Sequence, residues 1–126
     1  MAENNVISVV DDDPSMCRML ARGIEAAGFE VAIFPSAEEF LVSGRAIHTA
    51  CLILDVDLPG MNGIELQKLL NESGVEIPIV FISGHADEQT GNRALEAGAI
   101  GFFNKPFSIE GLVATIQNLE DQLNPI

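Results

Sequence analysis

The sequence contains no tryptophan, no tyrosine and few cationic residues. Lysine and arginine together number six, against 19 aspartates and glutamates, and the formal net charge is −13. Nucleic acids and anionic membranes are bound through clusters of lysine and arginine, so we expect this chain to bind neither directly. The sequence also has no apolar run near the roughly 20 residues that span a bilayer. These absences predict a soluble, cytoplasmic protein.

Cysteine is scarce as well, and the two that occur lack the spacing of a metal or redox site. Cys17 falls in a helical pattern and Cys51 begins an apolar run, so we interpret both as small buried hydrophobic residues. A chain of 126 residues that is 48% hydrophobic is long enough to bury one ordinary core. We therefore predict a single domain over residues 1–126.

Five short apolar runs alternate with helical patterns along the chain. The runs cover residues 6–10, 29–34, 51–54, 77–82 and 100–103. This alternation is typical of an α/β fold in which a five-stranded parallel sheet is flanked by five helices. The helical pattern over 87–97 is the weakest, because its apolar stripe is little more than Ala94 and Leu95, and Gly91 costs about 1 kcal/mol relative to alanine. We expect that helix to be the most mobile element.

Polar side chains follow four of these strands at the same end. They are Asp11 and Asp12 after the first run, Asp55 after the third, Ser83 after the fourth and Lys105 after the fifth. Ligands of an open parallel sheet bind at the carboxyl ends of its strands, so these side chains are expected to gather in one site. Taken singly, each residue also suits a helix cap, a turn or a solvated surface. Their joint occurrence at four strand ends favours the shared site.

The expected cluster contains three carboxylates that repel one another. If the first and third strands are neighbours, about 4.8 Å apart, then Asp11, Asp12 and Asp55 lie close enough to cost about 4 kcal/mol per pair at an effective dielectric of about 20. The Lys105 ammonium relieves part of this repulsion, and a divalent cation with oxygen ligands, Mg2+ before Ca2+, relieves the remainder. Such a set suits phosphoryl transfer. Because no serine, threonine or cysteine nucleophile stands beside a base, the predicted nucleophile is a carboxylate.

Four segments carry a resemblance to a known family. They read VVDDD at 9–13, LDVDLPGMNG at 54–63, SGHAD at 83–87 and KPF at 105–107. Together they resemble the receiver domain of two-component response regulators, over essentially the whole chain. The SAEEFL stretch at 36–41 and the SGHAD stretch are most similar to the FixJ type within that family. The resemblance implies a flavodoxin-like sheet with the strand order 2-1-3-4-5.

The resemblance also implies the chemistry at the strand ends. Asp55 would be the phosphoacceptor, taking a phosphoryl group from a sensor histidine kinase. Asp11, Asp12 and Asp55 would hold Mg2+ together with the backbone carbonyl of Asp57. Such a domain is a signalling phosphoacceptor rather than an enzyme that acts on other substrates, although it catalyses its own phosphorylation and dephosphorylation.

Other residues match the positions that respond to the phosphoryl group. Ser83 matches the switch hydroxyl that moves onto it, and Lys105 matches the lysine that binds it, in front of a cis-proline. Phe102 matches the rotameric switch aromatic, where tyrosine is frequent. Asp57 and His85 occupy variable positions that tune dephosphorylation in this family. The implied partners besides the kinase are a second copy, through the fourth helix, fifth strand and fifth helix, and either a C-terminal DNA-binding domain or a separate effector.

Three other interpretations share parts of this pattern. Haloacid-dehalogenase-like phosphatases also have an Asp-x-Asp sequence, but on their first core strand, and turnover of a phosphomonoester would identify one. A flavodoxin-like FMN carrier would need a first loop that cradles phosphate, which residues 11–13 would repel, and this chain has no tryptophan or tyrosine to stack on a flavin. A degenerate receiver that only binds proteins has little support, because the acidic set is intact.

Overall fold

The structure is a computed structural model that describes residues 6–85 and 87–123. Within these ranges five parallel strands form one sheet in the expected order, β2-β1-β3-β4-β5. The strands are β1 (Val6–Val10), β2 (Glu30–Phe34), β3 (Thr49–Asp55), β4 (Ile79–Ser83) and β5 (Gly101–Asn104). The helices are α1 (Pro14–Ala26), α2 (Ala37–Ser43), α3 (Gly63–Glu72), α4 (Glu88–Glu96) and α5 (Ile109–Leu123), with a short 3₁₀ helix η1 (Arg45–His48). Ala86 of the SGHAD segment and both ends of the predicted 1–126 domain lie outside the described residues.

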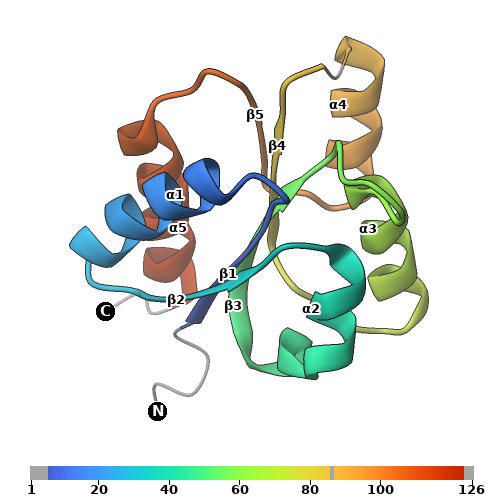
Figure 1. Cartoon of the computed structure of the whole chain (residues 1–126), viewed down its shortest axis with the longest axis horizontal. Coiled ribbons are helices and arrows are strands. Elements are labelled where there is room, and N and C mark those ends of the chain that lie inside the picture. Colours follow the sequence, from blue (N-terminus) through green and yellow to red (C-terminus); the bar gives the residue numbers. More distant parts are fainter. Residues whose placement is uncertain (1–5, 86, 124–126) are drawn as a thin grey trace.

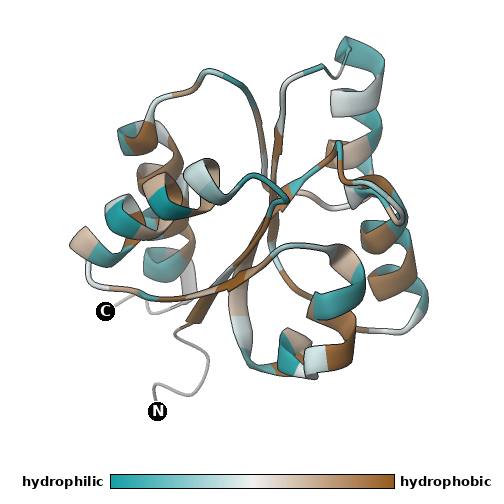
Figure 2. Cartoon of the chain, viewed as in Figure 1, coloured by the Kyte–Doolittle hydropathy of each residue, from teal (hydrophilic) through white to brown (hydrophobic). Residues whose placement is uncertain are grey.

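Helices cover both faces of the sheet (Figure 1). On one face α1 and α5 pack against side chains such as Ile7 and Ile53, and on the other α2, α3 and α4 pack against side chains such as Leu52 and Leu54. Successive side chains of a strand point to opposite faces, so one continuous apolar run fills both cores. Figure 2 shows the hydrophobic residues concentrated along these central strands. Among the described residues no helix is both apolar enough and long enough to cross a bilayer.

The strand boundaries after β1 differ from the sequence prediction by one or two residues. β3 begins at Thr49 because this polar residue is buried with its hydroxyl paired to Ser8 Oγ at 2.7 Å and donating to the Arg45 carbonyl at 2.8 Å. An apolar run does not reveal a buried polar strand residue. β4 begins at Ile79 rather than at residue 77, after Pro78, whose nitrogen has no proton to donate to a ladder.

The first turn of α1 shows which of the consecutive aspartates caps the helix. The Asp13 carboxylate accepts a hydrogen bond from the N–H of Ser15 at 2.9 Å, and Pro14 is the first helical residue. The simpler explanation of the acidic run as a cap therefore applies to Asp13. Cys17 and Cys51 are both buried and free, as predicted.

The helical pattern over 87–97, the weakest in the sequence, corresponds to α4, which buries only a small face. Ala94 is buried, but Leu95 is 46% exposed, so the predicted apolar stripe is wrong at Leu95. A Cβ added to Gly91 would stand 3.7 Å from the ring of Phe102, so this glycine faces β5. The mobility of α4 stays a prediction.

Candidate functional site

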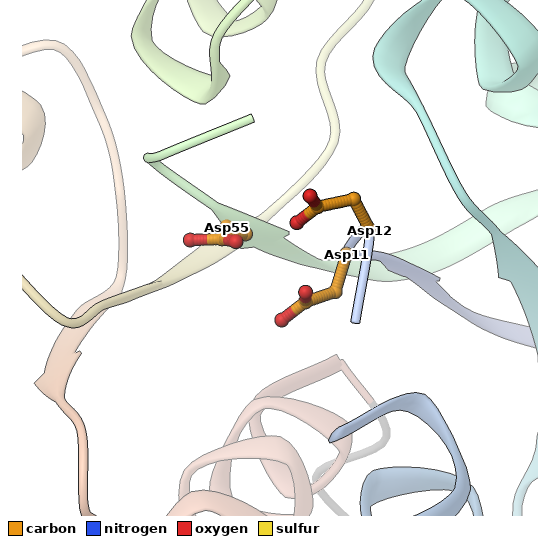
Figure 3. A group of neighbouring side chains, drawn as sticks. All are labelled: Asp11, Asp12 and Asp55. Carbon is orange, nitrogen blue, oxygen red and sulfur yellow. The ribbon is translucent and has the colours of Figure 1, made fainter. Parts of the chain in front are cut away.

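Three carboxylates lie together where β1 and β3 end (Figure 3). The sheet register pairs Val10 with Leu54, so the residues that follow them, Asp11 and Asp55, stand side by side. Their exposures are 1% and 2%, whereas Asp12 is exposed. Carboxylate oxygens from all three side chains lie within 4.8 Å of one another. The structure thus brings together the three acids that the sequence placed in one site.

Backbone N–H groups orient the two buried carboxylates. The N–H of Asp13 donates to Asp11 Oδ1 at 2.9 Å, and the N–H of Asp57 donates to Asp55 Oδ1 at 3.1 Å. One oxygen of each carboxylate is therefore held by the chain two residues further on. The other oxygen of each, Oδ2, is the one that approaches Lys105.

Lys105 reaches the cluster from just beyond β5. Its Nζ lies 3.4 Å from Asp11 Oδ2 and 3.6 Å from Asp55 Oδ2. Burial acts to lower the pKa of the Lys105 amine, but the two carboxylates outweigh it and the pKa is raised, so this group is an ammonium at neutral pH. The N–H of Lys105 donates to the Ser83 carbonyl at 2.8 Å, and the peptide bond to Pro106 is cis, as expected.

The surroundings of Asp55 disfavour its charged form. Burial raises the pKa of this carboxyl to about 6, the N–H of Asp57 and the Lys105 ammonium oppose the rise, and the charge of Asp11 adds to it. At neutral pH the carboxylate is still mostly ionised, but it is poorly hydrated compared with a surface aspartate. A carboxyl whose pKa is shifted by burial and by a specific charged neighbour is typical of reactive sites.

Ser83 ends β4 and is fully buried. Its hydroxyl donates to Asp57 Oδ2 at 2.8 Å, and the N–H of Gly84 donates to the same oxygen at 3.3 Å. Sequence reasoning assigned Asp57 only a backbone carbonyl and a tuning position, and it missed this bond. The strand register carries the signal, because Asp55 pairs with Ile82, which brings Asp57, two residues beyond β3, near Ser83 at the end of β4.

Phe102 packs between β4 and α4. It is half-buried, its ring centroid lies 5.9 Å from that of Phe81, and Gly91 of α4 faces it. His85 is exposed beside the site, where the sequence placed it. The predicted site residues therefore form a carboxylate and ammonium cluster, a hydroxyl one strand away, and an aromatic ring on the α4 side.

The acidic cluster fits a hard divalent cation. Every side chain in it offers oxygen, the element that Mg2+ and Ca2+ prefer. Mg2+ holds its ligands at about 2.0–2.1 Å, so that opposite oxygens are about 4.2 Å apart. Because the carboxylate oxygens of Asp11, Asp12 and Asp55 already lie within 4.8 Å of one another, small side-chain movements suffice for them to share one ion.

Gly63, the first residue of α3, lies against the backbone of Asp55. A Cβ here would overlap the Asp55 carbonyl oxygen and stand 3.0 Å from the Cα of Val56. We expect Gly63→Ala to lower the free energy of unfolding by about 1–3 kcal/mol, the usual cost of overpacking.

At Gly91 a Cβ makes only ordinary contact with Phe102, so Gly91→Ala is expected to raise the free energy of unfolding by about 0.5–1 kcal/mol through helix propensity. Urea unfolding checks both, and a Gly63→Ala variant as stable as the wild type would contradict the close packing of α3 on Asp55.

Comparison with known proteins agrees with this geometry. Residues 7–117 match the response regulator receiver domain family. The response regulator protein TmoT of Ectopseudomonas mendocina is 43% identical over 115 residues, which are 91% of this chain and 52% of TmoT. The transcriptional regulatory protein FixJ of Bradyrhizobium diazoefficiens is 34% identical over 125 residues, which are 99% of this chain and 61% of FixJ.

The chain is also similar to a solved structure in both fold and sequence. The crystal structure of FixJ-N superposes with a TM-score of 0.81 at 31% identity, and the match covers 92% of this chain and 93% of that one. The chain spans between about half and three fifths of the curated relatives named above.

Proposed function

The chain belongs to the response regulator receiver domain family, and from this premise we propose that Asp55 accepts a phosphoryl group from a sensor histidine kinase. The observation that carries the proposal is the setting of its carboxylate, which is almost fully buried, grouped with two further acids, and 3.6 Å from Lys105 Nζ. Membership of this family, with relatives of the expected FixJ type, also decides against the phosphatase and the flavin carrier.

Asp55 acts as the nucleophile in the proposed reaction. A carboxylate oxygen forms the bond to phosphorus while the phosphorus–nitrogen bond to the kinase histidine breaks, and the electron pair of that bond returns to the imidazole ring. The Lys105 ammonium is placed to bind oxygens of the arriving phosphoryl group. Attack of water on phosphorus later releases inorganic phosphate and restores the Asp55 carboxylate, which ends the signal.

Asp11, Asp12 and Asp55, with the backbone carbonyl of Asp57, are the groups that would hold Mg2+. When bound, the ion would neutralise charge on the phosphoryl oxygens during transfer. The carboxylates of Asp11 and Asp55 are preorganised for this task, since backbone N–H groups already fix one oxygen of each.

The phosphorylated state is read out on the α4, β5 and α5 face in our proposal. Ser83 and Lys105 bind the phosphoryl group, and Phe102 transmits the change by altering its burial. Exposed apolar side chains support this face as a contact surface, because Leu95 on α4 and Ile100 just before β5 are 46% and 39% exposed. The partner there is a second copy, a C-terminal DNA-binding domain or a separate effector. The second of these is suggested by the curated relatives, which are longer than the matched region.

Mg2+-dependent labelling by acetyl phosphate tests the proposed function. We expect intact-mass analysis to show one added phosphoryl group per chain with excess Mg2+ and little or none with EDTA, because the three clustered acids otherwise repel the phosphate donor. Reduction with borohydride converts a phosphoaspartate to homoserine, so peptide mass mapping should then locate the label at Asp55. Absence of labelling with Mg2+, or a label on another residue, would refute the assignment.

A further inference from the structure

The hydroxyl of Ser83 is held by a carboxylate that the proposed reaction does not otherwise use. Ser83 Oγ donates to Asp57 Oδ2 at 2.8 Å. The same Asp57 oxygen accepts the N–H of Gly84 at 3.3 Å, while the backbone N–H of Asp57 donates to Asp55 Oδ1 at 3.1 Å. Asp57 therefore connects the end of β3, which carries the phosphoacceptor, to the end of β4, which carries the switch hydroxyl.

This bond competes with the phosphoryl group for a single proton. A serine hydroxyl has one proton to donate, so Ser83 cannot bind a phosphoryl oxygen on Asp55 while it donates to Asp57. The Ser83 oxygen also accepts the N–H of His85 at 3.2 Å, which helps to hold the side chain in this orientation. A hydrogen bond to a carboxylate is stronger than one between neutral groups.

We propose that Asp57 is a positioning residue that holds Ser83 away from the phosphoacceptor, so that phosphorylation must break the Asp57–Ser83 bond before the switch can proceed. This inference rests on the proposed function of Asp55. The same Asp57 oxygen also accepts from Gly84, in the loop that leads from β4 to α4. Asp57 thereby lowers the affinity of the off state for a phosphoryl group. It also sets how far a given degree of phosphorylation shifts the protein from the off state to the switched state.

Removing the Asp57 side chain would also favour binding of an anionic phosphoryl group for a simpler reason, the loss of a neighbouring negative charge. A double-mutant cycle separates the two effects. Asp57→Ala removes the charge, the acceptor of Ser83 and the acceptor of Gly84 in the wild type. In a Ser83→Ala background no hydroxyl is left to release, so the difference between the two backgrounds reports the Asp57–Ser83 bond. Asp57→Asn gives an independent arm, since its amide oxygen can still accept from Ser83 although the charge is gone.

The experiment is calorimetric titration with beryllofluoride, a phosphoryl analogue that adds to a carboxylate, at saturating Mg2+. We expect Asp57→Ala to tighten beryllofluoride binding by a factor about five times larger in the wild-type background than in the Ser83→Ala background. A fivefold ratio between the two factors corresponds to one net hydrogen bond. Asp57→Asn should tighten binding by less than Asp57→Ala. Urea midpoints of all variants serve as the control for folding.

Two results would overturn the inference, and they are distinguishable from failure of the proposed function. An equal effect of Asp57→Ala in both backgrounds would show that only charge matters, and weaker binding by Asp57→Ala would show that the residue assists phosphorylation. A folded wild type that binds no beryllofluoride with Mg2+ present would instead refute Asp55 as phosphoacceptor, and this inference with it.

Discussion

Asp55→Asn is expected to carry no phosphoryl group under conditions of acetyl phosphate and Mg2+ that label the wild type fully. The asparagine amide has nearly the shape of the carboxylate, so it preserves packing around a side chain that is 2% exposed. It lacks the negative charge that makes the carboxylate oxygen a nucleophile. Intact-mass analysis over a time course, beside the wild type, measures the loss.

The same substitution two residues further on supplies the matched control. Asp57→Asn keeps the backbone carbonyl that would contribute to the Mg2+ site, and its side chain lies outside the three-carboxylate cluster. We expect this variant to take up one phosphoryl group. Full labelling of Asp55→Asn would reassign the phosphoacceptor, whereas loss of labelling in both variants would show that the substitutions disturb the whole strand end.

The strand ends were the predictable part of this protein because two physical patterns coincide there. The buried strands are largely apolar, and the acidic residue that follows the apolar run marks the rim of the sheet, as at Asp11 and Asp55. The runs alone do not determine which strands are neighbours. That order came from the family resemblance, and the structure confirms it through the pairing of β1 with both β2 and β3.

Contacts between polar side chains were the part that sequence patterns could not supply. Thr49 is buried because it pairs with Ser8, 41 positions away, and the pairing lengthens β3 beyond its apolar run. The bond from Ser83 to Asp57 joins the end of β4 to the loop after β3, and it depends on strand register and side-chain rotamers. Leu95 was expected to face inward, yet α4 buries only its narrow Ala94 side, as suits a helix that packs against few neighbours.

Without a metal ion, the stability of the folded protein is expected to carry a penalty from Asp55 that depends on pH. The ordinary pKa of this carboxyl is 3.8, and burial raises it to about 6 in the folded state. Between these values the folded protein binds more protons than the unfolded chain, so the free energy of unfolding falls as the pH rises. The penalty is absent below about pH 4, is complete above about pH 6, and amounts to about 3 kcal/mol at most.

Asp55→Asn isolates this contribution from the other acids that titrate in the same range. The variant should be more stable than the wild type by about 1 kcal/mol near pH 4.5 and by up to about 3 kcal/mol above about pH 7, because its side chain has no charge to bury. Urea unfolding from about pH 4.5 to pH 8 in EDTA measures the difference. Mg2+ at tenfold excess over its Kd should then restore about 1.4 kcal/mol to the wild type and less to the variant, which lacks one carboxylate ligand. A difference between the two proteins that stays constant across this pH range would show that folding imposes no penalty on the ionised Asp55 carboxylate.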